Sequence, residues 1–169
     1  MSEARIVHDM NGLKGLQTPA VMGAVADGLL AEIDLAFDAQ EDPYGEAWKP
    51  LAPITKELRR GDGNRAQILQ DTGILKSSLF HRVEPGHFFI GTNLEYAATH
   101  QYGATIKPKN APRLFLGVLQ RGAKRIPITA NQVTIPARPF LPEQGRIPES
   151  WERSIFETLT AMIKQVWRK

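Results

Sequence analysis

The sequence predicts an α+β fold in which a small antiparallel sheet packs against two long amphipathic helices, with long loops rich in proline and glycine. Three observations support this prediction. Apolar residues recur every fourth position between residues 21 and 37, which indicates a helix. A second helical stripe of apolar residues runs from 151 to 166. Between them, two apolar runs flank the Pro85-Gly86 pair, as expected of a β-hairpin.

Residues 1–17 are predicted to form a flexible arm, because two glycines interrupt any periodicity there. The first helix should follow directly, since Thr18 is suited to cap it and Pro19 to occupy its first position. Its apolar stripe predicts an end near Ala39. A chain of 169 residues fits one core, so residues 18–169 are expected to form a single domain.

The final helix is predicted to begin after Pro148. Acidic side chains in its first turn and basic ones in its last turn favour the helix dipole. Its predicted apolar face consists of Trp151, Ile155, Leu159, Met162, Ile163 and Val166.

The segment after the first helix should turn sharply. Asp42-Pro43-Tyr44-Gly45 has the residues of a type I turn. Trp48 follows, and we expect its indole to anchor the loop to the body of the domain. Residues 55–65 are basic and contain two glycines, so they are predicted to form an exposed, mobile loop.

The central stretch is expected to organise the chain. A short helical segment is predicted at 73–78, and the hairpin spans 79–90, with at least one further strand needed for stability. A Gly-Thr-Asn turn, a short helix and a stop at Gly103 then follow within residues 91–103. This stretch carries few reactive groups, so we interpret it as a packing joint.

Prolines recur between residues 104 and 146, and short strands are predicted at 114–119, 125–129 and 132–135. The last two of these strands flank Ala130-Asn131. We expect them to pair as an extended hairpin.

Composition excludes several classes of function. The chain has no cysteine, which excludes disulfides, thiolate metal sites and cysteine nucleophiles. No apolar run approaches the roughly 20 residues that span a bilayer, and no signal peptide is recognisable, so we expect folding in a cytoplasm. The net charge of +3 is modest.

Candidate reactive groups are sparse. Asp71-Thr72-Gly73 matches the aspartic protease triplet, but a second carboxylate could come only from another subunit, and a helix-capping role for Asp71 or Thr72 is favoured. The four histidines lack paired metal-ligand spacing. No serine lies in a Gly-x-Ser-x-Gly elbow. We therefore predict no enzyme activity, no cofactor and no metal.

Two basic clusters, at residues 56–65 and 107–125, could contact nucleic-acid phosphates. No aromatic residues are interleaved with the first cluster, as a stacking platform would require. Solvated loop charge is the favoured interpretation, and a nucleic-acid-binding module stays open as an alternative.

Four motifs occur in order along the chain. They are Phe37 with Glu41-Asp42-Pro43-x-Gly45-x-x-Trp48-x-x-Leu51, Ile68-Leu69-x-x-Thr72-Gly73-x-Leu75-x-x-Ser78, Gly91-Thr92-Asn93-x-x-Tyr96-Ala97-x-x-His100-Gln101-x-Gly103, and Ile135-Pro136-Ala137-Arg138-Pro139-Phe140-Leu141. Over roughly residues 20–165 the chain resembles the phage virion morphogenesis family, the tail completion proteins of Mu-like and P2-like tailed phages.

The resemblance implies a structural protein similar to tail terminators. Such a protein would cap the tail tube as a homo-oligomeric ring, with implied sixfold symmetry, and take part in tail completion and head–tail joining. The implied partners are the tail tube protein and the connector or neck proteins, and DNA would pass through the lumen without specific binding. The implied location is the neck of the virion, after assembly in the host cytoplasm. A head-side connector or adaptor is the nearest alternative.

The resemblance also implies structural or interface roles for the motif residues. These are Asp42, Pro43, Gly45, Trp48, Thr72, Gly73, Leu75, Gly91, Asn93, Tyr96, His100, Gln101, Gly103, Arg138, Pro139 and Phe140. Our hypothesis is that residues 138–140 and the His100-Gln101 turn hold both a sheet edge and the joint between subunits. Alanine at Phe140 and Arg138 should then leave folded monomers that cannot form rings.

Overall fold

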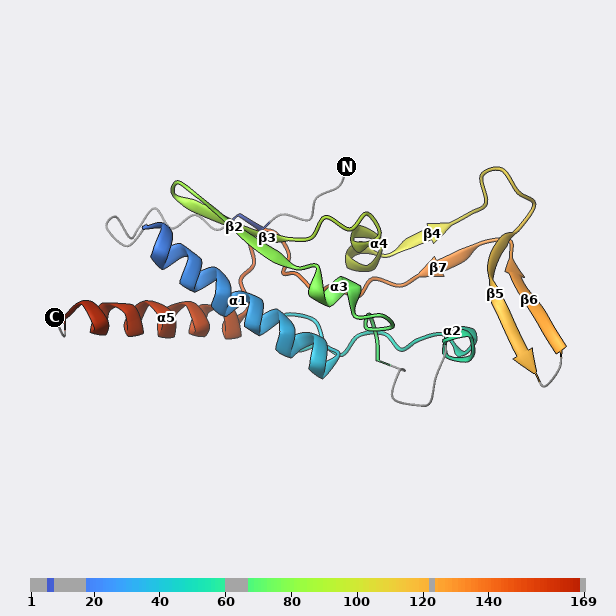
Figure 1. Ribbon diagram of the computed structural model, residues 1–169, viewed down its shortest axis with the longest axis horizontal. Helices are drawn as coiled ribbons and strands as arrows, with labels where there is room; N and C mark the ends of the chain where they lie inside the picture. The colour runs from blue at the N-terminus through green and yellow to red at the C-terminus, as the bar shows by residue number, and fades with distance from the viewer. Residues whose placement is uncertain (1–5, 8–17, 60–66, 122–123, 168–169) are drawn as a thin grey trace.

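The computed structural model describes residues 6–7, 18–59, 67–121 and 124–167. It confirms a mixed fold of helices and small antiparallel sheets (Figure 1). The predicted single sheet is wrong, because the described strands form one three-stranded and two two-stranded sheets. The elements in chain order are β1 (Ile6–Val7), α1 (Pro19–Ala39), α2 (Pro53–Leu58), α3 (Ile74–Ser77), β2 (Phe80–Glu84), β3 (His87–Gly91), α4 (Ala97–Tyr102), β4 (Ala104–Ile106), β5 (Leu114–Arg121), β6 (Lys124–Ala130), β7 (Val133–Ile135) and α5 (Glu149–Trp167).

Helix α1 begins and ends where the sequence predicts. The Thr18 hydroxyl accepts a hydrogen bond from the Val21 N–H at 3.3 Å, and Pro19 occupies the first turn. The helix ends at Gln40, whose left-handed φ of 58° terminates the run. Its buried face consists of Val21, Met22, Val25, Ala26, Leu29, Ile33 and Phe37.

Helix α1 lies between the β2–β3 hairpin and helix α5 (Figure 1). The approach to α5 is close, since a Cβ added at Gly28 would lie 3.3 Å from the Ser154 hydroxyl oxygen. The predicted apolar face of α5 is buried only near its start: Trp151 is buried, whereas Ile163 is exposed. The second half of α5 extends past the start of α1 and past the β2–β3 hairpin (Figure 1).

The predicted hairpin is confirmed. Strands β2 and β3 pair in an antiparallel register around Pro85-Gly86, and Gly86 has the positive φ of 83° that the third position of a type II turn requires. Strand β1 supplies the predicted third strand, pairing Ile6 with Ile90. The rest of the predicted N-terminal arm lies outside the described residues.

The predicted pairing within the 114–135 region is wrong. Strand β6 pairs with β5, the strand before it, and β7 pairs with β4. Two separate ribbons result. The β4–β7 ribbon leads away from the core, and the β5–β6 ribbon, which we call the tongue, lies at one end of the molecule (Figure 1).

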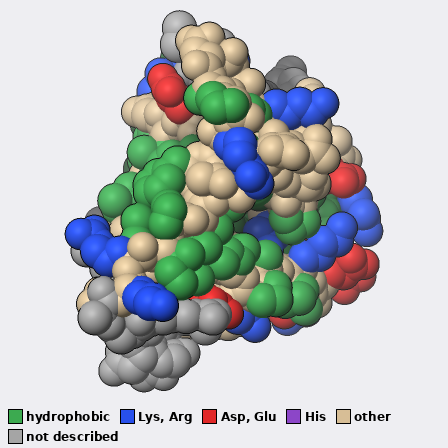
Figure 2. All heavy atoms as spheres, turned by 90° about the vertical axis from the view of Figure 1, so that its right-hand side faces the viewer, with side chains coloured by type: hydrophobic (Ala, Val, Ile, Leu, Met, Phe, Trp, Pro, Cys, Tyr) green, Lys and Arg blue, Asp and Glu red, His purple; other side chains and the backbone are tan. Residues whose placement is uncertain are grey.

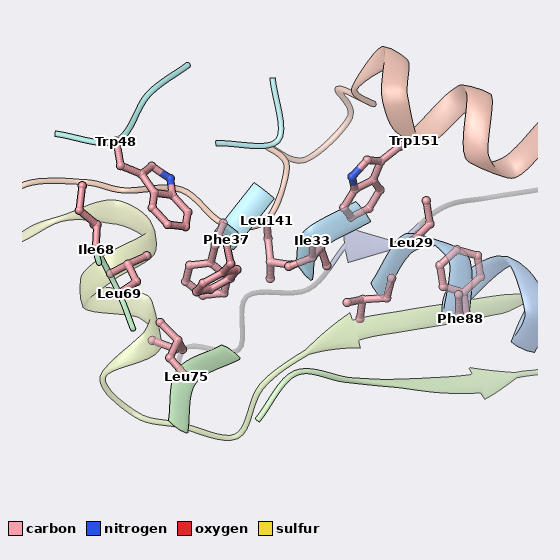
Figure 3. Close-up of a cluster of buried hydrophobic side chains, with 14 of the residues drawn as sticks. Leu29, Ile33, Phe37, Trp48, Ile68, Leu69, Leu75, Phe88, Leu141 and Trp151 are labelled. Atoms are coloured by element: carbon pink, nitrogen blue, oxygen red, sulfur yellow. The ribbon is translucent and has the colours of Figure 1, made fainter. Parts of the chain in front are cut away.

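The core is a continuous cluster around α1. Figure 3 shows Phe37 and Ile33 between the two tryptophans, with Leu29 and Phe88 toward the hairpin end. The Phe37 and Trp48 rings meet edge to face, with centroids 5.2 Å apart. The predicted anchoring role of Trp48 is therefore confirmed.

Two local predictions need correction. Residues 53–58 form helix α2, so the start of the predicted mobile loop is helical, while residues 60–66 lie outside the described part. The predicted segment at 73–78 is the short helix α3, but Gly73 caps it without a side-chain hydrogen bond. Thr72 reaches the Ile74 N–H only at 3.5 Å, and Asp71 makes no cap.

Candidate assembly interface

The third and fourth motifs meet at a hydrogen-bonded joint. Gln101, only 4% exposed, accepts hydrogen bonds from the N–H groups of Phe140 and Leu141 at 3.0 and 3.1 Å and donates to the Leu141 carbonyl at 2.7 Å. The Arg138 N–H donates to the His100 carbonyl at 2.8 Å. Helix α4 is thereby fixed to the segment that follows β7.

The first motif joins the same place through its loop. Arg138 is 5% exposed, and its guanidinium donates to the carbonyls of Lys49 and Pro50 at 2.7 and 2.9 Å. The Trp48 indole N–H donates to the Pro139 carbonyl at 2.7 Å. We call this network of Trp48, Gln101 and Arg138 with their backbone partners the joint.

The turn at Asp42 is confirmed. Hydrogen bonds to the Asp42 carboxylate stabilise it from within, and the Tyr44 hydroxyl binds it to residues 143 and 146. The Asp42 carboxylate accepts from the N–H groups of Tyr44 and Glu46 at 2.8 and 2.9 Å. The Tyr44 hydroxyl accepts from the Glu143 N–H and donates to the Arg146 carbonyl. Tyr44 was not singled out from the sequence, because a turn residue gives no signal of a partner about a hundred positions away.

Gly103 is required by close contact as well as by conformation. Its φ is 74°, and an added Cβ would lie 2.8 Å from the Ala137 nitrogen and 3.0 Å from the Ile135 oxygen. The predicted stop of the helix is therefore also the point at which α4 passes directly against the chain after β7.

His100 has an unusual environment beside the joint. Its Nδ1 is buried without a hydrogen-bond partner among the described residues. Burial lowers the pKa of His100, and the positive charges of Arg138 and Arg59 lower it further. The imidazole is therefore held neutral.

A groove of about 1090 Å³ opens beside the joint. Helix α2, strand β7 and the base of the tongue supply its apolar walls, including Leu58, Leu116 and Ile135. Asp71 lies at this groove, 53% exposed and 3.8 Å from Arg59. That is a solvated, charge-paired setting rather than the desolvated one of a protease carboxylate. Arg59 was not predicted as part of the site.

The described residues contain no group of three or more histidine and acidic side chains placed to hold a metal. None of the helices found among those residues is both long enough and apolar enough to cross a bilayer.

The tongue differs from the joint because several of its apolar side chains are exposed to solvent. Strand register places Phe115, Val118, Arg125 and Thr129 on one face. Phe115 is 66% exposed. The opposite face holds Gly117, whose added Cβ would lie 3.1 Å from Leu58 of α2. Figure 2 views this end of the molecule and shows hydrophobic side chains among lysines and arginines.

A model of the phage virion morphogenesis family matches residues 6–164 of the chain. The chain belongs to this family. Searches of curated proteins and of solved structures give no match. Membership of the phage virion morphogenesis family supports a structural role in the phage virion, since the family is a structural, non-enzymatic one.

In this phage virion morphogenesis protein the four motifs contact one another: the first, third and fourth meet at the joint, and the second contacts the third. The second and third motifs touch where the hydroxyls of Ser78 and Thr92 lie 2.7 Å apart. Among the predicted site residues other than glycine, Thr72, Asn93 and Tyr96 are exposed. Thr72 and Tyr96 lie at the groove, where the Tyr96 ring meets that of His100 edge to face. The remaining predicted residues are distributed over the joint, the turns and the core: Asp42, Pro43, Gly45, Trp48, Gly73, Leu75, Gly91, His100, Gln101, Gly103, Arg138, Pro139 and Phe140.

The burial of the fourth motif corrects one expectation. Phe140 is 0% exposed, and its ring centroid lies 5.8 Å from that of Phe37. It therefore belongs to the core of a single chain. Alanine at Phe140 and Arg138 should destabilise the monomer itself, contrary to the hypothesis from sequence that folded monomers would remain.

Proposed function

We propose that the protein caps the end of a phage tail tube as a homo-oligomeric ring, and that it takes part in tail completion and head–tail joining. Membership of the virion morphogenesis family supports this role. The observation that best supports a ring is the exposed apolar surface of the tongue. A two-stranded ribbon is marginal in water by itself, and this one leaves Phe115 and Val118 exposed, so a neighbouring molecule is needed to cover it.

Ring closure requires head-to-tail contacts between different surfaces of each copy. The tongue lies at one end of the molecule, away from α1 and α5 (Figure 1). It can therefore supply one of the two surfaces of a heterologous contact. We propose a sixfold ring in the neck of the virion. Its partners would be the tail tube protein on one side and the connector or neck proteins on the other.

The joint suits such a role because it fixes the base of the β4–β7 ribbon, which carries the tongue (Figure 1). Gln101 and Arg138 bind the backbone beyond β7 to helix α4 and to the loop that carries Trp48. A force applied to the tongue by a neighbouring molecule would therefore be transmitted to the core and would not simply bend a loop. Buried, fully hydrogen-bonded networks rigidify a structure in this way.

In this proposal DNA passes through the lumen without specific binding. Each neutralised phosphate adds salt-sensitive affinity and would slow the passage of DNA. The net charge of +3 on 169 residues is modest, which is compatible with a passive channel.

The test is electron microscopy of particles produced without this protein. The proposal predicts free heads beside tails with ragged or overlong ends, and recovery of joined particles when the protein is supplied. Normal, joined tails in its absence would contradict the proposal. Headless tails with correctly finished ends would favour the head-side connector role instead.

One observation favours a function of a different class. Residues 104–135 contain basic side chains and no acidic one, as in a nucleic-acid-binding arm. The basic residues are Lys107, Lys109, Arg113, Arg121, Lys124 and Arg125. Strong retention on DNA that falls steeply with salt, from a protein that stays monomeric, would support this alternative.

A further inference from the structure

The charges of the chain are separated between two of its elements. Residues 104–135, which include the tongue, carry only basic charged side chains. Helix α1 carries only acidic ones: Asp27, Glu32, Asp34 and Asp38. Because the tongue and α1 lie in different parts of the molecule (Figure 1), opposite charges of this kind favour contact between two copies.

Helix α1 also presents an apolar depression next to its acidic residues. A shallow groove of about 540 Å³ lies between α1 and α3, and Leu30, Ala31 and Leu79 line it together with Asp34 and Lys76. Lys76 pairs with Asp38 at 2.7 Å and lies 3.9 Å from Asp34, so one basic side chain offsets part of the acidic charge of α1 at this groove. Leu35 follows the groove residue Asp34 and is 63% exposed, and Ile74 follows the groove residue Gly73 and is 51% exposed. Exposed apolar residues grouped in this way mark an interaction surface.

The outer face of the tongue has complementary features. Phe115 and Val118 are exposed apolar side chains, and Arg125 lies on the same face nearer the tip. The opposite face is directed at Leu58 of its own chain. Ile126 on that opposite face is 37% exposed, against 66% for Phe115, so the outer face presents the more exposed apolar side chain to a neighbour.

We propose that the outer face of the tongue of one copy docks into the α1–α3 groove of the next copy. Phe115 and Val118 cover Leu35 and the groove, and Arg125 approaches the acidic side of α1. This contact rests on the proposed ring and assigns its two surfaces. It is heterologous, so repeating it around a closed ring leaves neither surface open.

Cysteine cross-linking tests the contact directly, because the natural sequence contains no cysteine. Thr129 pairs with Phe115 across the tongue, and Ala31 lines the groove; both are exposed. A chain carrying Thr129→Cys and Ala31→Cys should form a ladder of cross-linked species under mild oxidation. The matched control carries Thr129→Cys and Ala161→Cys, the latter on the exposed side of α5, and should give no ladder.

A charge exchange provides the second readout. Arg125→Glu alone and Asp34→Arg alone should each reduce the oligomeric fraction measured by light scattering at low salt. The double variant should restore most of it, since each contact then again contains one charge of each sign. The side chains of both residues are exposed, so thermal melts should show that the chain stays folded in every variant.

The outcomes separate this inference from the proposed ring. Rings that cross-link only in the Ala161→Cys control, with no charge rescue, would overturn the docking contact and leave the ring intact. Monomers under all conditions, including with tail tubes, would overturn both. A tongue whose Phe115→Ser and Val118→Ser changes abolish DNA retention without affecting assembly would overturn the contact in favour of nucleic-acid binding.

Discussion

The side chain of Gln101 closes two hydrogen bonds with one residue 40 positions away. Its amide nitrogen donates to the Leu141 carbonyl at 2.7 Å, and its amide oxygen accepts from the Leu141 N–H at 3.1 Å. The same oxygen also accepts from the Phe140 N–H. One buried amide thus replaces the strand partner that this backbone lacks, and it holds the tongue-bearing segment against the core.

Replacing Gln101 by Leu should leave three buried backbone groups without partners. At about 1–3 kcal/mol for each unsatisfied group, we expect a loss of at least about 3 kcal/mol in the free energy of unfolding, measured by urea denaturation. Gln132→Leu is the matched control because Gln132 is exposed, and it should change stability little. Equal stability of the two variants would contradict the role of the joint.

Gly103→Ala should be more costly than an alanine at another glycine with positive φ. A backbone with φ of 74° and ψ of 160°, as at Gly103, costs a residue with a Cβ roughly 1–3 kcal/mol. At Gly103 the added Cβ would also lie 2.8 Å from the Ala137 nitrogen, whereas at Gly86 nothing lies within 4 Å. The melting temperature should therefore fall further for Gly103→Ala than for Gly86→Ala, and the reverse order would exclude the close approach.

Phe140 and Phe115 should behave oppositely on truncation. Phe140→Ala removes a fully buried ring, and we expect about 3–5 kcal/mol of destabilisation. Phe115→Ala removes an exposed ring, so the monomer should lose no more than about 0.5 kcal/mol. Denaturation of the monomer, together with the oligomeric fraction from light scattering, distinguishes a core residue from a contact residue. An unchanged oligomeric fraction for Phe115→Ala would count against the tongue as an interface.

His100 should make the fold less stable in acid. Its pKa lies below the ordinary value of 6.5 in the folded chain, so below that pH the unfolded chain binds more protons than the folded one. Stability from the neutral imidazole is present above pH 6.5 and is lost as the pH falls through the folded pKa.

A comparison of urea denaturation at about pH 7.5 and about pH 5 checks this pH dependence. His100→Gln should reduce the difference in stability between the two pH values. The control His87→Gln, at a half-buried hairpin position beside Glu84, should leave the His100 contribution in place. A pH dependence that His100→Gln does not alter would show that other groups cause it.

Local features of this fold could be predicted from sequence because a few neighbouring residues determine them. Thr18 caps α1 through a hydrogen bond three residues away, Pro85-Gly86 sets the hairpin turn, and Gly103 ends α4. Each depends on backbone conformations that those residue types favour or permit. The family motifs contain the side chains of the joint, but the sequence does not show which motif residues are buried.

Strand partners and the joint could not be predicted in the same way. Alternation of apolar residues does not say whether β6 pairs with the strand before or after it, particularly where both faces carry apolar side chains. The bonds from Trp48 to Pro139 and from Arg138 to Lys49 join residues about ninety positions apart. The separation of acidic and basic segments was present in the sequence, but only the structure assigns it to two distinct surfaces.

The most direct test of the central claim, that this chain acts through contacts between its own copies, is its mass by light scattering, alone and mixed with purified tail tubes. The account predicts a closed multimer, six copies if the proposed symmetry is correct, either free in solution or bound at tube ends. A protein that remains monomeric at every concentration and in the presence of tubes would contradict it.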